Sequence, residues 1–266
     1  MTSWTLALGL FTVAPVDTPA DPPRSQVRRA ILLAPVVGLL LGLCGAAVLI
    51  GARALYSQRI FDQPNDPLAL ALASVFAIAA VEIATGGLHL DGLSDSADGL
   101  AARGGRDRSL DAMRDPRIGA VGAATLILAL LVSVLALALA VTRGHGTEAI
   151  TTSVVAGRVA IVWGCTLPAA RADGLGVWVS GVVGRRAALL ETVAALAVPA
   201  ALCLWDDDRS RSATAVVMAA LPLALVVTAA VLLPLYRRIG GITGDLLGAA
   251  CVITTTACLA IVAAAP

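Results

Sequence analysis

Three aspartates at helical spacing stand out in a chain that is otherwise mostly apolar. Asp91, Asp95 and Asp98 lie at positions i, i+4 and i+7, a spacing that places their side chains along one face of a helix. Like charges at this spacing repel one another, so the arrangement needs a cation or a group of arginines opposite it. Carboxylates are hard oxygen ligands, and Mg²⁺ is usually held by one or two of them together with substrate phosphates. The spacing therefore predicts that all three are magnesium ligands and that the substrate is phosphorylated.

The residues around this stripe fit the same chemistry. Residues 89–117 contain six aspartates and five arginines, although charged residues make up only 14% of the chain. Arginine side chains bind phosphate oxygens through paired donors, and phosphoryl transfer needs positioning and charge neutralisation more than a protein nucleophile. A mixed-charge segment can also be an ordinary solvated loop, which is an equal alternative for Asp107 and Arg108. His89 is open to three roles: a ligand, a proton carrier or an interfacial cap.

Two further polar motifs lie later in the chain. The motif "RRIGGITGDLLGAA", residues 237–250, would bring Asp245 and backbone N–H donors to the same face as the aspartate stripe. Its simpler interpretation is a helix start with Thr243 or Asp245 as the N-cap. The motif "RADGLGVWVSG", residues 171–181, is a glycine-rich loop whose simpler interpretation is a turn.

The elements that must position these motifs are membrane-spanning helices. The chain has 266 residues, 58% of them hydrophobic, and this composition excludes an ordinary soluble globular protein. Seven apolar runs are long enough to cross a bilayer as helices: 30–52, 67–88, 118–142, 149–167, 187–204, 213–235 and 246–265. We expect an all-α polytopic transmembrane bundle that forms one membrane domain over residues 1–266. The short apolar piece 4–14 predicts a re-entrant or interfacial helix.

The arginines predict the orientation of this bundle. Thirteen of the nineteen arginines fall on the side of the N-terminus and five on the other side, while Arg158 lies within an apolar run; the chain has no lysine. Positively charged loops are retained in the cytoplasm, so we expect a multi-pass protein of the plasma (inner) membrane. The N-terminus and the 89–117 segment would then be cytoplasmic. We expect the lipid bilayer as a partner and no nucleic acid, and small residues throughout the spans would suit a homo-oligomer.

Cysteine and histidine add little metal chemistry. The five cysteines all lie in apolar runs without a CxxC pair, which predicts packing residues. The chain has only two histidines, so a zinc site has almost no ligands.

Three motifs of the sequence resemble those of a known family. The strings "TGGLHLDGLSDSADG" (85–99), "MRDPRIGAVG" (113–122) and "GGITGDLLGAA" (240–250) are similar to the cobalamin synthase family of adenosylcobinamide-GDP ribazoletransferases. The early "APVVGLLLG", the lone arginine at Arg158 and "RADGLG" also match features of that family, so the resemblance covers essentially the whole chain.

The resemblance implies a Mg²⁺-dependent transferase of cobalamin biosynthesis. The hydroxyl of α-ribazole, or of its 5′-phosphate, would attack the cobinamide-linked phosphate of adenosylcobinamide-GDP and release GMP. Contacts with other enzymes of the pathway would lie on the cytoplasmic face. Glu82, within the second apolar run, is costly in lipid and is interpreted as lining a substrate cavity. Beyond the three metal ligands, the implied site comprises the carboxylates Asp115 and Asp245 and the substrate-binding residues His89, Arg103, Arg117, Arg158, Gly240, Gly241 and Thr243.

Two other functions remain as alternatives on the sequence. The strings "DSADGLAAR" and "DAMRD" partly imitate the motif of CDP-alcohol phosphotransferases, but the gap from Asp98 to Asp111 is shorter than that motif requires. An ion-coupled transporter could use Glu82 and the loop aspartates. The acids cluster at the membrane surface, however, and no inverted repeat is evident, which argues against a transporter.

Overall fold

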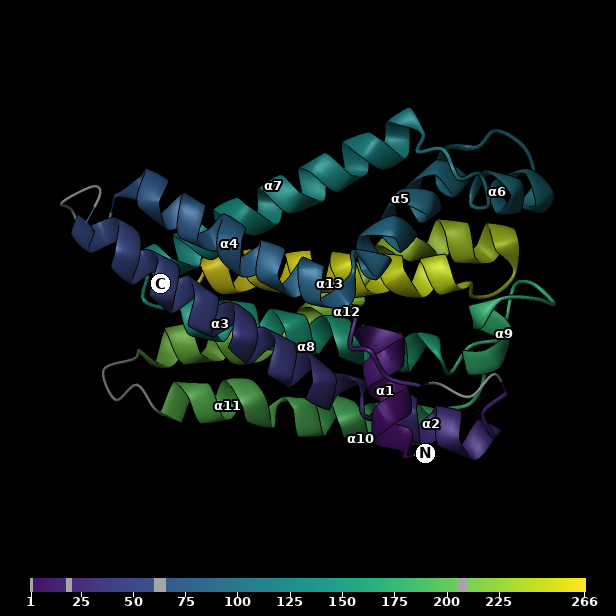
Figure 1. Ribbon diagram of the computed structural model, residues 1–266, viewed down its shortest axis with the longest axis horizontal. Helices are drawn as coiled ribbons and strands as arrows, with labels where there is room; N and C mark the ends of the chain where they lie inside the picture. Colours follow the sequence, from purple (N-terminus) through teal and green to yellow (C-terminus); the bar gives the residue numbers. More distant parts are fainter. Residues whose placement is uncertain (1, 18–20, 60–65, 205–209) are drawn as a thin grey trace.

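The chain folds as a bundle of long helices with short helices gathered at one end. The computed structural model describes residues 2–17, 21–59, 66–204 and 210–266, and Figure 1 shows the long helices lying side by side. The segments that run along the bundle are α2 (Arg24–Leu32) with α3 (Ala34–Arg59), α4 (Pro67–Thr85), α7 (Ala120–Thr142), α8 (Gly146–Gly164), α10 (Arg185–Ala195) with α11 (Ala197–Leu204), α12 (Arg211–Ile239) and α13 (Gly244–Ala263). The remaining helices are α1 (Ser3–Phe11), α5 (Leu88–Ala101), α6 (Arg106–Ala112) and α9 (Leu175–Val179). Within the described residues the only β-pairing is an isolated bridge between Ala169 and Ile242, so the all-α prediction is confirmed.

Six helical segments of the described chain are long and apolar enough to cross a membrane. They are 24–56, 67–85, 120–142, 185–204, 211–239 and 244–263, and each matches a run predicted from the sequence. The remaining predicted run corresponds to α8, which carries Glu148 and Arg158 and is buried over nearly its whole length. A helix enclosed by its neighbours needs no lipid-facing apolar surface, so α8 can be more polar than the six other segments. The count of seven spans stays a prediction.

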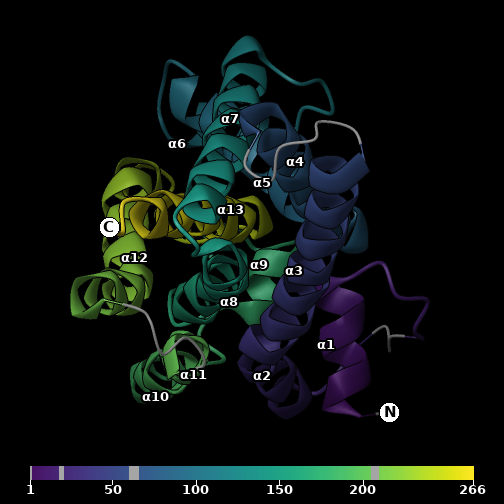
Figure 2. The same ribbon diagram turned by 90° about the vertical axis from the view of Figure 1, so that its left-hand side faces the viewer.

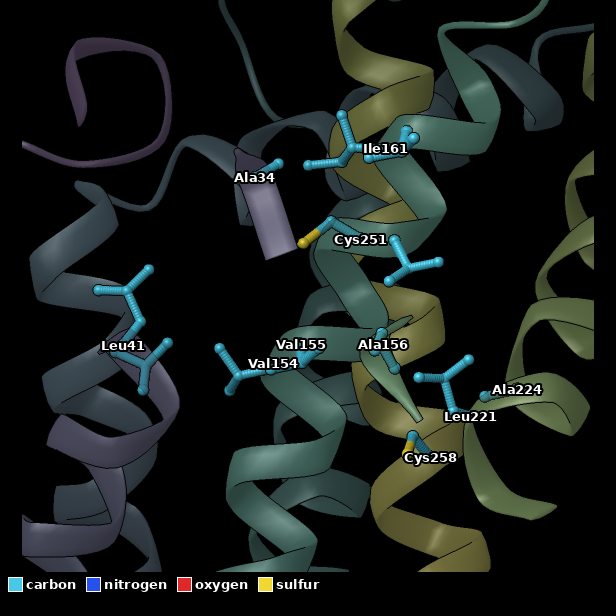
Figure 3. Packing of buried hydrophobic residues seen from close by; sticks show 14 of the residues in the cluster. Ala34, Leu41, Val154, Val155, Ala156, Ile161, Leu221, Ala224, Cys251 and Cys258 are labelled. Carbon is cyan, nitrogen blue, oxygen red and sulfur yellow. The ribbon is translucent and has the colours of Figure 1, made fainter. Parts of the chain in front are cut away.

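The buried helix α8 lies at the centre of the bundle, with α3, α12 and α13 packed around it (Figure 2). Small residues allow this close packing: a Cβ atom on Gly42 would lie 2.9 Å from the Cα of Thr151, and one on Gly157 would lie 2.8 Å from the carbonyl oxygen of Cys251. Close approach of backbones at small residues is the usual basis of helix packing in membranes. Figure 3 shows Cys251 and Cys258 among the packed aliphatic side chains.

The cysteine prediction can be checked against burial. Cys165, Cys251 and Cys258 are buried, and no disulfide joins any of the five cysteines in the described part of the chain. These three are packing residues, as predicted. Cys44 is exposed and Cys203 is partly exposed, both on helices that form the outside of the bundle.

Helix α1 runs across the direction of the long helices in Figure 1. It has nine residues, too few to span a bilayer, and it ends where Thr12 leaves the helical conformation. One face is buried through Leu6, Ala7 and Phe11, which pack against the bundle. This crosswise position matches an interfacial helix more closely than a spanning one.

The segments predicted to lie on one side of the membrane do gather at one end of the bundle. Helices α5, α6 and α9 lie together at the right-hand end in Figure 1, and the C-terminus lies toward the opposite end. At that opposite end, the Arg143 side chain donates a hydrogen bond to the carbonyl oxygen of Ala265. The alternation of the spans thus places residues 89–117, 168–184 and 240–243 at a common end, where the candidate site forms.

Candidate active site

A sharp turn sets the direction of the helix that carries the aspartate stripe. Gly86 and Gly87 both have positive φ angles, 65° and 70°, a conformation that glycine adopts without steric cost. The turn ends α4 and starts α5 at Leu88, so α5 leaves the axis of the preceding span. Asp91, Asp95 and Asp98 all lie on α5, which confirms the predicted helix.

The three aspartates of the stripe have different surroundings. The two carboxylate oxygens of Asp98 accept hydrogen bonds from the backbone N–H groups of Gly119 and Gly122, at 2.7 and 2.8 Å. Asp98 thereby satisfies free N–H groups at the start of α7. A Cβ atom on Gly119 would lie 2.3 Å from the Asp98 carboxylate, so glycine is needed for this contact. Asp98 therefore ties α5 to α7, whatever else it binds.

Asp91 and Asp95 form a carboxylate group with Asp245 of α13. Burial is the largest cause that raises the pKa of Asp95 to about 6, and the negative charges of Asp91, Asp245 and Asp98 add to it, while Arg171 acts in the opposite direction. Asp91 and Asp95 accept no hydrogen bond from any described residue. These two carboxylates have no hydrogen-bond partners and lie one helical turn apart, and the third comes from a distant segment. Together the three make a strongly negative region that attracts cations.

Close packing between α5 and α13 brings Asp245 to this group. A Cβ atom on Gly92 would lie 2.6 Å from the Asp245 carbonyl oxygen, and one on Gly248 would lie 3.2 Å from the Cα of Gly92. The two glycines therefore let the two helices touch through their backbones. Residues more than 150 positions apart meet because of this contact, and the sequence alone does not show it.

The residues before Asp245 have structural roles. Gly240 ends α12 in the left-handed conformation with φ of 76°, and the Thr243 hydroxyl accepts a hydrogen bond from the N–H of Leu246, as an N-cap. A Cβ atom on Gly241 would lie 2.5 Å from the carbonyl carbon of Ala169, where the chain pairs with the 168–170 segment. The simpler interpretation of this motif, a helix start, is thus confirmed for Thr243. The predicted substrate contacts of these residues stay a prediction.

Arginines join the loops at this end of the bundle. Arg106 donates hydrogen bonds to the carbonyl oxygens of Ile239, at 3.0 Å, and Ala170. Arg238 donates to the carbonyl oxygen of Leu100 at 2.7 Å, and Arg114 forms an ion pair with Asp173 at 2.7 Å. These contacts connect the segments after α5, α8 and α12 into one unit.

Arg171 is the arginine that acts on the carboxylate group, and the sequence interpretation did not select it. Its charge opposes the rise in the pKa of Asp95, and its Nη2 donates a hydrogen bond to the carbonyl oxygen of Leu110 at 2.9 Å. Its Nε is buried without a partner among the described residues. The "RADGLG" motif, which also matches the family, was the available signal, but Arg171 was not assigned to the site from it.

The arginines predicted from the sequence to bind substrate have different surroundings in the structure. Arg117 binds Asp115 through two hydrogen bonds, at 3.0 and 2.8 Å, and this pairing lowers the pKa of Asp115 to about 2. Both lie on the loop between α6 and α7, and neither is among the charges that act on Asp95. Arg103 is exposed and makes no hydrogen bond or ion pair with a described residue. Arg103 is therefore available to a ligand, whereas Arg117 must first leave its partner.

His89, Glu82 and Arg158 face a separate cavity inside the bundle. This cavity has a volume of about 30 Å³, and Ser133, Ser153 and Thr255 also line it. A space of this size holds about one water molecule and excludes a corrinoid or a nucleotide. Glu82 and Arg158 each have a buried polar atom without a partner among the described residues. Glu82 therefore lines this small inner space and not the cavity that Asp91 and Asp245 line, and its predicted contact with substrate stays a prediction.

His89 lies between this inner cavity and the outer one. It is 5% exposed, and burial together with the positive charge of Arg158 lowers the pKa of His89 to about 3. The imidazole is therefore neutral near pH 7. A neutral histidine at the base of α5 suits a positioning role better than that of a cation that binds phosphate.

The outer cavity has a volume of about 210 Å³ and is lined by two of the three carboxylates. Asp91 and Asp245 line it, together with apolar residues from α1, α2, α8 and α9. Among the described residues, no three Asp, Glu, His or Cys side chains converge closely enough to hold a metal ion by themselves. The free carboxylates of Asp91 and Asp95 fit Mg²⁺ of the kind that is completed by water and substrate phosphates, and do not form an all-protein cage.

Comparisons with known proteins agree on one family. The sequence model described as cobalamin-5-phosphate synthase matches residues 3–263. Curated relatives named adenosylcobinamide-GDP ribazoletransferase include proteins from Frankia casuarinae, 38% identical over 97% of this chain and 92% of the relative, and from a Nocardioides species, 36% identical over 97% and 96%. A third, from Bradyrhizobium diazoefficiens, is 34% identical over 92% of this chain and 86% of the relative.

No solved structure matches the chain. The family match covers both the aspartate stripe on α5 and the Asp245 motif on α13, so the residues that meet at the carboxylate group all fall within it. The CDP-alcohol phosphotransferase and transporter alternatives receive no support from the relatives found. The resemblance noted in the sequence is confirmed, and the chain belongs to the cobalamin-5-phosphate synthase family of enzymes.

Proposed function

We propose that this protein transfers the cobinamide phosphate of adenosylcobinamide-GDP to α-ribazole, or to its 5′-phosphate, and releases GMP. The observation that carries the proposal is the meeting of Asp91, Asp95 and Asp245 beside Arg171 in a chain of this family. Attack on a diphosphate requires that the negative charge on the transferred and leaving groups be neutralised. A group of carboxylates can do this only through a bound cation, and arginine contributes directly.

Asp91 and Asp95 would hold Mg²⁺ between protein and diphosphate. When bound there, the ion supplies charge neutralisation and orientation of the phosphate oxygens. Asp98 supports this pair by fixing α5 against the start of α7. Arg171 lies beside the same carboxylates, where it can bind phosphate oxygens, and the exposed Arg103 is a second candidate.

The transfer is a single displacement in this scheme. The acceptor hydroxyl oxygen forms a bond to the phosphorus that carries cobinamide, and the bond from that phosphorus to the bridging oxygen breaks. GMP leaves with the bridging oxygen and its electron pair. The proton of the acceptor hydroxyl must also leave, and Asp245 would accept it, a role supported by its position in the lining of the same cavity as Asp91.

We further propose that the protein is a multi-pass protein of the plasma membrane, with this end of the bundle in the cytoplasm. The arginine distribution supports this orientation, because the arginine-rich segments gather at the end that contains the carboxylates. Both substrates are water-soluble, so an open cytoplasmic mouth suits them.

The test uses purified protein in lipid nanodiscs with adenosylcobinamide-GDP and α-ribazole 5′-phosphate. We expect GMP release and product formation that require Mg²⁺ and that fall at least about a hundredfold in Asp91→Asn and Asp245→Asn. Asp107→Asn is the matched control, because Asp107 is 91% exposed and lies on α6 outside the carboxylate group. Release of CMP from a CDP-activated lipid, unaffected by Asp245→Asn, would instead support the phosphotransferase alternative.

A further inference from the structure

The outer cavity is lined by two kinds of side chain. Asp91 and Asp245 provide carboxylates, and much of the remaining lining is apolar, with Phe11 from α1 and Leu175 and Val179 from α9. A cavity with mostly apolar walls and a few polar groups is the usual form of a site for a small ligand. Helices α1 and α9 thus have a role beyond packing, because they complete the lining of a cavity to which α5 and α13 contribute the carboxylates.

The apolar walls are held in fixed positions. Phe11 is 5% exposed and Val179 is 2% exposed, so neither can move far without disturbing its neighbours. A Cβ atom on Gly176 would lie 3.0 Å from the carbonyl oxygen of Ile242, and this contact holds α9 against the segment that precedes Asp245. In contrast, the Leu175 side chain is 42% exposed although it lines the cavity, which leaves apolar surface for a ligand to cover.

The volume and the lining of the outer cavity indicate which part of the two substrates can bind inside it. A corrinoid ring is far too large for a cavity of about 210 Å³, so cobinamide must remain outside it. Carboxylates could accept hydrogen bonds from the N1–H and N2–H groups of guanine, but among the lining side chains only His89 could donate to its O6 or N7, so the apolar walls would leave acceptor atoms of guanine without partners. The base of α-ribazole is a methylated benzimidazole with an apolar edge, which the aliphatic and aromatic walls can cover.

We infer that the apolar walls of this cavity bind the aromatic base of the acceptor nucleoside, with its ribose at the carboxylates. This inference rests on the proposed function, and it assigns the base contacts to Phe11, Leu175 and Val179. In this pose the base enters between α1 and α9, the ribose lies toward Asp91 and Asp245, and the corrinoid diphosphate approaches from the open side. The cavity thereby selects apolar bases over polar ones.

The experiment compares Leu175→Ala with Leu190→Ala in nanodiscs. Both remove the same atoms from a partly exposed leucine, but Leu190 lies on α10, is 69% exposed and does not line the cavity. For Leu175→Ala we expect KM for α-ribazole to rise roughly tenfold with little change in kcat, because apolar contact with the base is lost. KM for adenosylcobinamide-GDP should stay within about twofold, and Leu190→Ala should match the wild type. The wild type should also prefer a benzimidazole nucleoside to a purine nucleoside, and Leu175→Ala should reduce that preference.

Other outcomes overturn the inference. Equal KM values for α-ribazole in the two leucine variants would show that the base binds elsewhere. A weaker inhibition by GMP in Leu175→Ala, with α-ribazole unaffected, would assign the cavity to guanine. If the wild type transferred nothing from adenosylcobinamide-GDP, the proposed function would fail, and equilibrium dialysis of free α-ribazole would test the cavity separately. Binding to the wild type and to Leu190→Ala, but not to Leu175→Ala, would then still support the base site.

Discussion

Replacing Asp95 with asparagine should stabilise the protein while it abolishes transfer. Burial and three neighbouring aspartates raise the pKa of Asp95 from its ordinary value of 3.8 to about 6, so the folded protein disfavours the charged form. A shift of this size corresponds to about 3 kcal/mol at 1.36 kcal/mol per pKa unit. Water still reaches this carboxylate, and screening reduces the effect to about 1 kcal/mol. Asparagine keeps the size and removes the charge, so the variant should gain about that amount.

The pH dependence follows from the direction of the shift. Because the folded-state pKa is raised, the folded protein keeps the Asp95 proton between about pH 4 and pH 6, where the unfolded chain has lost it. The charged Asp95 carboxylate therefore lowers the free energy of unfolding only when it forms. This destabilisation is absent below about pH 4, grows as the pH rises to about 6, and is complete above that. The advantage of Asp95→Asn over the wild type should show the same profile.

The assay is thermal unfolding in detergent with a chelator present, so that no divalent cation offsets the repulsion. At pH 7.5 we expect Tm of Asp95→Asn to exceed that of the wild type by about 2–4 °C, and the difference to shrink at pH 4.5. Addition of Mg²⁺ should raise Tm of the wild type more than that of the variant. Asp107→Asn, on the exposed surface of α6, should leave Tm unchanged. A lower Tm for Asp95→Asn at pH 7.5 would refute the reasoning, because it would mean that the carboxylate is stabilised by a partner.

Three further predictions concern packing, orientation and phosphate binding. Gly92→Ala should cost about 1–3 kcal/mol and reduce activity, since its Cβ would lie 2.6 Å from the Asp245 carbonyl oxygen; an unchanged Tm would contradict this contact. A cysteine at Arg108 should be protected from an impermeant thiol reagent in intact cells, while one at Ser212 should be labelled; the reverse pattern would invert the proposed orientation. Arg171→Gln should raise KM for adenosylcobinamide-GDP at least about tenfold, measured by steady-state kinetics, and an unchanged KM would remove this arginine from the site.

Local features of the sequence were enough to predict the helices and the aspartate stripe. Apolar runs marked the segments 67–85, 120–142 and 244–263 to within a few residues, because a helix in lipid must be apolar over a fixed length. The spacing of Asp91, Asp95 and Asp98 identified one helix face, since the helical period is fixed by the backbone. The family also followed from the sequence, because its motifs are long, contiguous strings.

The tertiary structure decided which of these groups meet. Asp245 joins Asp91 and Asp95 because Gly92 and Gly248 let two helices touch, and Asp98 is occupied by the N–H groups that begin α7. The choice of arginine depends in the same way on how separate loops pack: among the charges acting on Asp95, the arginine is Arg171 and not those nearer in sequence. Periodicity and composition predict the secondary structure of a segment and the side chains that share one face over a few helical turns. The partners of a side chain depend on distances between helices, and those are set by packing of the whole bundle.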